Sequence, residues 1–212
     1  MIVAIETATE VVGVALAEPT GSLIAHLEVR GSRRHAETLG PAIEFLCRQS
    51  GRSLAELTKV AVDVGPGLFT GLRVGVTTAK ALAYAHGLAV VGVGSLEALA
   101  AAHARPGERI AAVIDARRGE LYSAHYRDGI ELLAPWVGSP ESVASQCISA
   151  LFVVGDGPDR HLDAFAGLPT VSAHPSVAAI AHLAAGRDGI DAGLVEVSYL
   201  RAPDAEINWA KR

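Results

Sequence analysis

Short apolar runs alternate with helical patterns along the chain, and the order of these elements repeats once. Runs of strand length are followed by stretches whose apolar residues recur every three or four positions. The predicted strands cover residues 2–5, 11–17, 23–29, 60–64, 88–93, 110–114, 120–126, 130–137, 151–154 and 168–172. The predicted helices cover 35–50, 71–86, 95–104 and 175–186, with another opening at Ser139 and a short one at Ser53. Each half therefore begins with three strands and then alternates helices with strands.

This repeat predicts the fold class. Two copies of one pattern indicate two α/β domains of one kind, each a mixed five-stranded sheet flanked by helices. The turn Arg105-Pro106-Gly107 separates the two halves. We therefore expect an N-terminal domain over residues 1–104 and a smaller C-terminal domain over 105–212, with the tail packing back on the first domain.

The glycine loop at residues 65–67 stands between a predicted strand and a predicted helix, for which Thr70 is a suitable N-cap and Gly87 a C-cap. Such a loop ahead of a helix is a candidate phosphate cradle. The match to known phosphate motifs fails, however. A G-x-G-x-x-G pattern needs glycine where Thr70 stands, and a P-loop needs a lysine that the chain lacks there.

The helix predicted over 71–86 carries a stripe of small residues at every fourth position. These residues are Gly71, Gly75, Ala79 and Ala83. Because most other positions are also apolar, the helix is expected to be buried on more than one side. Two interpretations stay open: the stripe packs inside the chain's own core, or it admits a helix from another chain.

Composition narrows the class of protein. The chain has 212 residues, half of them hydrophobic, and a formal net charge of −5, which exclude a disordered chain and disfavour an extended nucleic-acid surface. Cys47 and Cys147 are far apart and suggest neither a disulfide framework nor a zinc site. No signal peptide or membrane-length apolar stretch is recognisable, so we expect a cytoplasmic protein without a membrane partner.

Several stretches together carry a family resemblance. Two three-strand halves, with Glu6 and Asp115 at the end of the first strand of each, resemble the actin-like (ribonuclease H-like) superfamily of sugar kinases and Hsp70 proteins. More specifically, four motifs resemble the TsaB (YeaZ) family over essentially the whole chain. They are Ile5-Glu-Thr-Ala-Thr9, His35-Ala-Glu37, Val64-Gly-Pro-Gly-Leu-Phe-Thr-Gly-Leu-Arg-Val-Gly75, and Tyr199-Leu-Arg201 followed by Asp204-Ala-Glu206.

The resemblance implies a function and a set of partners. It implies a non-catalytic scaffold subunit in the complex that installs N6-threonylcarbamoyladenosine at position 37 of tRNAs reading codons that start with A. The implied partners are a TsaD-like transferase of the same fold, which the subunit would bind and activate, and a TsaE-like ATPase. The tRNA would be met through the complex, and the chain alone is expected to form a homodimer.

The family pairs through helices of its N-terminal domain, so we expect the two long helices of the first half to bind the partner. The residues expected in this contact are Leu39, Ile43, Leu46, Gly71, Leu72, Gly75, Val76, Ala79, Lys80 and Ala83. A Gly75→Leu substitution is expected to block close approach of the partner while leaving the chain folded.

Candidate catalytic chemistry is sparse. The catalytic relatives hold a metal with an H-x-x-x-H pair, and no two of the eight histidines here have that spacing. We interpret Glu6, Thr7 and Asp115 as degenerate nucleotide-site positions, and expect no catalytic residue, metal or cofactor. The alternative is an ATP-dependent small-molecule kinase or ATPase of the same superfamily, which the loop Gly155-Asp156-Gly157 would support.

Overall fold

The first half of the chain forms a five-stranded sheet. The computed structural model describes residues 1–31 and 35–201, so the Asp204-Ala-Glu206 motif lies outside the described residues. The strands are β1 (Ile2–Glu6), β2 (Val11–Ala17), β3 (Leu23–Arg30), β4 (Lys59–Gly65) and β5 (Val90–Gly94). Their order is β3-β2-β1-β4-β5, with the β1–β2–β3 meander antiparallel and β1, β4 and β5 parallel. The sheet is therefore mixed, as predicted.

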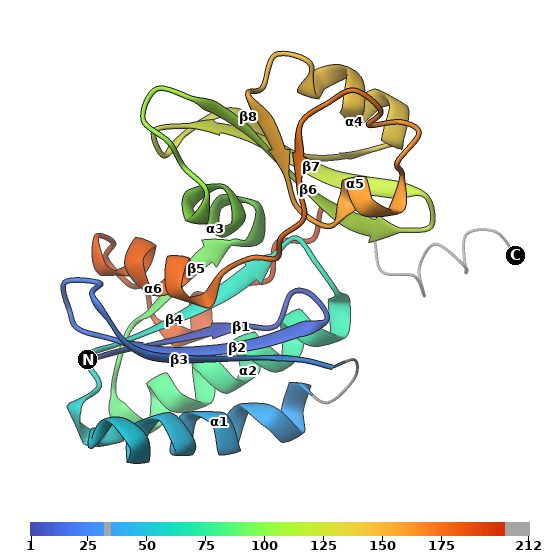
Figure 1. The fold of residues 1–212 in the computed structure, drawn as a ribbon. Helices are drawn as coiled ribbons and strands as arrows, with labels where there is room; N and C mark the ends of the chain where they lie inside the picture. The colour runs from blue at the N-terminus through green and yellow to red at the C-terminus, as the bar shows by residue number, and fades with distance from the viewer. Residues whose placement is uncertain (32–34, 202–212) are drawn as a thin grey trace, which may run out of the picture.

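Helices cover both faces of this sheet. Helices α1 (His35–Ser50) and α2 (Phe69–His86) lie side by side against one face, and α6 (Val177–Ala185) lies against the other (Figure 1). Alternate residues of β1 therefore enter different cores: Val3 and Ile5 pack towards α1 and α2, while Ile2 and Ala4 pack towards α6. Burial on both faces explains why β1, β2 and β4 read as nearly continuous apolar runs.

The second half repeats the arrangement. Its strands are β6 (Arg109–Arg117), β7 (Glu120–Arg127), β8 (Ile130–Gly138), β9 (Phe152–Val154) and β10 (Thr170–Val171), in the order β10-β9-β6-β7-β8. Helix α3 (Ser95–Ala102) packs between the two sheets, and α4 (Pro140–Cys147) covers the far face of the second sheet (Figure 1). The short helix α5 (Gly157–Arg160) follows β9.

The last described segment runs back to the first sheet and then crosses to the second. After α6, Ile190 pairs with Val90 of β5, and the N–H of Ser198 donates to the carbonyl oxygen of Val64 at 2.7 Å. The guanidinium of Arg201 then donates to the carboxylate of Glu120 in the second sheet at 3.0 Å. The segment therefore connects both halves after the second sheet is complete.

The fold class predicted from the pattern is confirmed, and local details differ. Helix α2 begins at Phe69 with Leu68 as its N-cap, so the prediction of Thr70 as N-cap is wrong, whereas Gly87 does end the helix in a left-handed conformation. None of the described helices is both long and apolar enough to cross a bilayer. The domain boundary at residue 104 stays a prediction.

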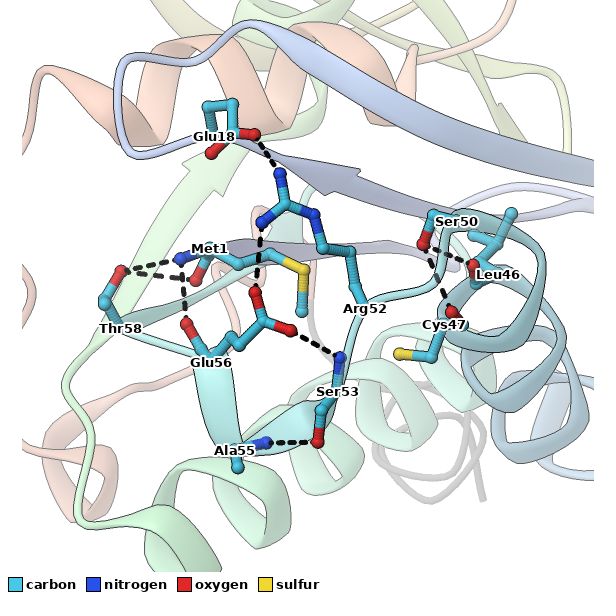
Figure 2. Close-up of polar contacts among 10 residues, drawn as sticks. All are labelled: Met1, Glu18, Leu46, Cys47, Ser50, Arg52, Ser53, Ala55, Glu56 and Thr58. Atoms are coloured by element: carbon cyan, nitrogen blue, oxygen red, sulfur yellow. Dashed lines mark hydrogen bonds and ion pairs between the residues drawn. The ribbon is translucent and has the colours of Figure 1, made fainter.

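The predicted short helix at Ser53 is confirmed in the connection between α1 and β4. Residues Leu54–Glu56 form a 3-10 turn in which the Ser53 hydroxyl accepts from Ala55 and the Glu56 carboxylate accepts from the Ser53 N–H at 2.8 Å (Figure 2). Arg52 binds Glu56 at 3.0 Å and Glu18 at 2.5 Å. These contacts anchor the α1–β4 connection to the β2–β3 turn.

Candidate functional site: a closed cleft and a helical face

A polar cleft of about 240 Å³ lies where the first sheet meets the second. The first half contributes the turn after β1 and Arg30, and the second half contributes the end of β6, the start of α5 and the segment around His174. Of the predicted degenerate positions, Asp115 lines this cleft.

The carboxylate of Asp115 is already paired within the chain. Its Oδ2 atom lies 2.9 Å from Nε of Arg160 and 3.3 Å from Arg117, while Oδ1 accepts from the Arg117 N–H at 2.9 Å. Arg117 also bridges to Glu10 across the cleft at 2.7 Å, and this contact lowers the pKa of the Glu10 carboxyl. Both oxygens of the Asp115 carboxylate are therefore held by arginines of the chain itself.

The glycines that suggested phosphate binding are explained by packing. A Cβ atom on Gly67 would collide with the backbone of Ala8, and one on Gly155 would collide with the Val113 carbonyl. The N–H of Leu68, at the loop end, donates to the Ala8 carbonyl at 2.7 Å. Close packing of these loops on the chain's own backbone is thus a sufficient reason for glycine at both positions.

The structure does not bring the three degenerate positions together. Glu6 and Thr7 are fully buried and point to opposite faces of the first sheet, Thr7 towards Gly75 of α2 and Glu6 towards Gly13 and Val177. Asp63 of β4, which the sequence analysis overlooked, lies beside Glu6 and is equally buried. The signal that could have found it is an acid inside the apolar run of residues 60–64, on the strand beside β1.

Within the described part of the chain, no group of three or more histidine, cysteine, aspartate or glutamate side chains is placed to hold a metal ion. The buried pair His125 and Cys147 lies in the second half, with Sγ 3.9 Å from Nε2. Arg109 donates a hydrogen bond to Nδ1 of His125 at 2.7 Å, so the ring proton lies on Nε2. The Nε2–H group therefore donates to the Cys147 sulfur, which accepts. Burial raises the pKa of the Cys147 thiol to about 12, which leaves it unreactive at neutral pH.

The small-residue stripe of α2 faces the chain's own sheet, so the expectation that it receives a helix from another chain is wrong. A Cβ atom on Gly71 would collide with the Thr7 carbonyl, and one on Gly75 with the Thr7 hydroxyl. Ala79 and Ala83 are fully buried in the same core. The spacing shows only that these residues share one side of the helix, and that side is used for close packing on β1.

The other apolar residues expected in the partner contact are buried too. Leu39, Ile43 and Leu46 of α1, with Leu72 and Val76 of α2, are each at most 6% exposed. Only Lys80, half-buried, reaches the surface, where its amino group donates to the Gly193 carbonyl at 3.4 Å. These side chains shape the two helices from within, and a partner would touch other residues.

The outward faces of α1 and α2 carry a different set of side chains. The exposed residues include Gly40, Pro41, Glu44, Phe45 and Arg48 in the middle of α1, and Arg73, Thr77, Ala81, Tyr84 and Ala85 on α2. Two are large aromatics: Phe45 is 42% exposed and Tyr84 is 89% exposed. We call this set the α1–α2 outer face.

An apolar groove opens beside the N-terminal ends of these helices. It has a volume of about 760 Å³, and its apolar lining comes from Ala36, Leu68, Phe69 and Val74. Arg73 lies over the ring of Phe69 at 4.0 Å, and Tyr199 from the last described segment packs against the same ring at 5.2 Å. The groove therefore joins the α1–α2 outer face to the cleft, with which it shares Glu10, Leu68 and Arg117.

Comparison with known proteins agrees with this class of fold. The family model described as "TsaD: tRNA N6-adenosine threonylcarbamoyltransferase" matches residues 29–144. Protein ML0378 of Mycobacterium leprae is 36% identical over 97% of this chain, which spans 56% of that longer protein. The tRNA threonylcarbamoyladenosine biosynthesis protein TsaB of Bacillus subtilis is 29% identical over 98% of this chain and 97% of its own length.

The solved structure of YeaZ from Pseudomonas aeruginosa superposes with a TM-score of 0.80, at 29% identity, over 94% of this chain and 99% of that one. Fold and cleft thus define an actin-like two-sheet protein in which the cleft acid Asp115 is paired with Arg117 and Arg160 of the same chain. The family match covers more than half of the chain. The chain belongs to the TsaD family, as a member of its TsaB (YeaZ) group.

Proposed function

We propose that this protein takes part in the biosynthesis of threonylcarbamoyladenosine in tRNA as a non-catalytic subunit. The observation that carries the non-catalytic role is the state of Asp115, whose carboxylate is held by Arg117 and Arg160 in the cleft. The buried position of Glu6 supports the same conclusion, since a carboxylate inside the protein cannot reach a bound nucleotide or metal. The named relatives supply the pathway.

The subunit's task in this proposal is to bind and activate a TsaD-like transferase of the same fold. The α1–α2 outer face, with Phe45 and Tyr84, is the proposed contact, in place of the buried residues first expected. A partner built on the same fold would present a corresponding helix pair, which gives a four-helix contact of pseudo-twofold symmetry. In the absence of that partner, the same face is proposed to form a homodimer.

The remaining parts of the proposal concern the whole complex. A TsaE-like ATPase is proposed as a further member, tRNA as a ligand met through the complex, and adenosine 37 of tRNAs reading codons that start with A as the modified position. We also propose that the N-terminal domain ends at residue 104 and the C-terminal domain begins at residue 105.

The test is mass-spectrometric analysis of tRNA nucleosides after depletion of the protein. We expect threonylcarbamoyladenosine to fall, and to return when the wild-type chain is supplied. An Asp115→Asn variant should restore the nucleoside as well, because the proposed role does not use that carboxylate chemically. An unchanged nucleoside level on depletion would overturn the proposal. Failure of a folded Asp115→Asn chain to restore it would overturn the non-catalytic role alone.

One observation favours a second candidate, an actin-like kinase or ATPase. Asp115 and Asp156 both line the cleft, and the N–H of Asp115 donates to the Asp156 carboxylate at 3.0 Å, so two acids do stand where nucleotide chemistry occurs in this fold. The arginine pairs of Asp115 count against it. Binding of magnesium and ATP to the isolated chain separates the two candidates.

A further inference from the structure

Two carboxyl groups lie side by side inside the first sheet. Glu6 ends β1 and Asp63 lies near the end of the parallel neighbour β4, where Ile5 is registered with Val62, so the acids are the next pair along the two strands. Both side chains point away from α1 and α2, and both residues are 0% exposed. An acid pair in this position is unusual, because buried charges are normally neutralised by a partner.

Each carboxyl group uses one oxygen to hold a nearby loop. Oε1 of Glu6 accepts from the Ala8 N–H at 2.7 Å. Oδ1 of Asp63 accepts from the Gly65 N–H at 2.8 Å and from the Ser95 hydroxyl at 2.5 Å. The second oxygens, Oε2 of Glu6 and Oδ2 of Asp63, have no hydrogen-bond partner among the described residues.

The charged surroundings do not supply a cation. Within the described chain, no lysine, arginine or histidine forms an ion pair with Glu6 or Asp63. The other titratable group that faces Glu6 is Glu28 of β3, whose carboxylate accepts weakly from the Val177 N–H at 3.4 Å and whose charge adds to the repulsion. Two neighbouring carboxylates cannot both ionise in such a site.

We infer that Glu6 and Asp63 share one proton inside the fold, and that this pair locks the turn after β1 to the glycine loop before α2. The two unpartnered oxygens are the atoms between which the proton is held. Burial together with the neighbouring carboxyl raises the pKa of Glu6, and burial raises that of Asp63 to about 7.

The lock acts on the loops that line the cleft and the apolar groove. The turn held by Glu6 supplies Ala8, whose carbonyl accepts from the Leu68 N–H and whose backbone packs against Gly67. Ala8 and Leu68 both line the cleft, and Leu68 also lines the groove at the start of α2. Loss of the shared proton would place two like charges side by side at the root of both loops and loosen them together. This device is independent of the proposed pathway.

The direct test is a ¹³C NMR titration of the side-chain carboxyl carbons of Glu6 and Asp63 in the wild-type protein. We expect the two carbons to titrate as one coupled unit, with the last proton leaving well above the ordinary range of aspartate and glutamate, which is about 3.9 to 4.3. If both carbons titrate within that ordinary range while the protein stays folded, the inference is overturned.

The coupling to the loops is tested by amide hydrogen exchange at Gly65 and Leu68, corrected for the intrinsic pH dependence of exchange. In the wild type, protection of both amides should fall severalfold as the pair loses its proton. In Asp63→Asn, whose amide can donate to Glu6 without a titrating proton, the protection should no longer depend on this step. Glu28→Gln is the matched control, because it removes a nearby charge outside the pair and should keep the step. Unchanged protection in the wild type across the titration would refute the lock.

Discussion

The hydroxyl group of Thr7 fills the space beside Gly75. Thr7 follows β1 and Gly75 lies in the second turn of α2, so the contact fixes how closely this helix approaches the sheet. The Thr7 hydroxyl has no hydrogen-bond partner in the described part of the chain, and the residue is 0% exposed. Steric fit is therefore what holds α2 at this distance from β1.

A Gly75→Ala substitution should destabilise the protein, contrary to the usual effect of replacing glycine in a helix. Alanine would gain about 1 kcal/mol of helix propensity, but its Cβ atom would collide with the Thr7 hydroxyl. Overpacking of this kind typically costs about 1–3 kcal/mol and here should exceed the gain. Urea unfolding of the purified chain measures the difference.

Two further variants make that prediction specific. Gly40→Ala in α1 should be neutral or stabilising, since nothing lies within 4 Å of the added Cβ atom. The double variant Thr7→Ala with Gly75→Ala should recover most of the lost stability. If Gly75→Ala alone is as stable as Gly40→Ala, the close packing of α2 on Thr7 is not the reason for glycine at this position.

The isolated chain should not bind magnesium and ATP. Arg117 and Arg160 occupy the carboxylate of Asp115, and the Ala8 backbone fills the space beside Gly67. A triphosphate with magnesium would have to break the ion pairs of Asp115 before that carboxylate could face the metal. Isothermal titration calorimetry at protein concentrations near the millimolar range should give no binding heat, whereas saturable binding that Asp115→Asn abolishes would favour the kinase or ATPase alternative.

His125 should remain neutral in the folded protein down to about pH 4. Its ring is 0% exposed and accepts from Arg109, and burial together with that arginine lowers its pKa from 6.5 to about 4. The unfolded chain takes up this proton at higher pH than the folded one. The stability that the folded state gains from a neutral His125 is therefore complete above about pH 6.5 and is lost as the pH falls through 4. The full contribution is roughly 3 kcal/mol.

Histidine ring NMR shifts measure the His125 titration directly. The free energy of unfolding should also fall as the pH is lowered from about 6.5 to 4, because the unfolded chain binds this proton first. Titration of the His125 ring near its ordinary value, in a protein that is still folded, would contradict the prediction.

Stability should also decline on the alkaline side. Because the pKa of Asp63 is raised to about 7 in the folded state, its contribution is fully present below the unfolded value near 3.8 and is lost as the pH rises through 7. Urea midpoints measured between about pH 5.5 and 8.5 should therefore fall with pH. The double variant Glu6→Gln with Asp63→Asn should flatten this slope, and a slope equal to that of the wild type would contradict the assignment.

The fold was predictable because its signals are local. Strands such as β1, β2 and β4 are short runs rich in β-branched residues, and the turns between elements carry glycine, proline or a capping residue, as at Gly87 and Ser139. The start of α2 was misplaced because its N-cap, Leu68, makes no side-chain cap and its loop is held instead by the Ala8 carbonyl. That contact depends on the packing of two loops, which no local pattern reveals.

The site was less predictable, since periodicity shows which residues share a side of a helix and not what that side touches. Gly71 and Gly75 share the inner side of α2, and the structure shows that β1 lies there. In the same way, Glu6 and Asp63 were separated by 57 positions, and only the parallel pairing of β1 with β4 brings them together. The exposed aromatics Phe45 and Tyr84 carried no sequence signal beyond their own hydrophobicity.

Association should depend on the outer aromatic side chains and not on the buried stripe. Tyr84→Glu and Phe45→Glu place a charge at exposed positions on the α1–α2 outer face, so the fold should tolerate them. Each should weaken both the homodimer and binding to a TsaD-like partner by about tenfold or more, as expected for loss of an aromatic anchor together with an unpaired interfacial charge. Ile148→Glu, at a residue 73% exposed after α4, is the matched control and should leave both associations unchanged.

Light scattering and co-purification with the partner measure the two associations, and thermal melting confirms that each variant is folded. If folded Tyr84→Glu and Phe45→Glu chains dimerise and bind the partner like the wild type and the Ile148→Glu control, the α1–α2 outer face is not the contact surface, and the subunit must meet its partner elsewhere.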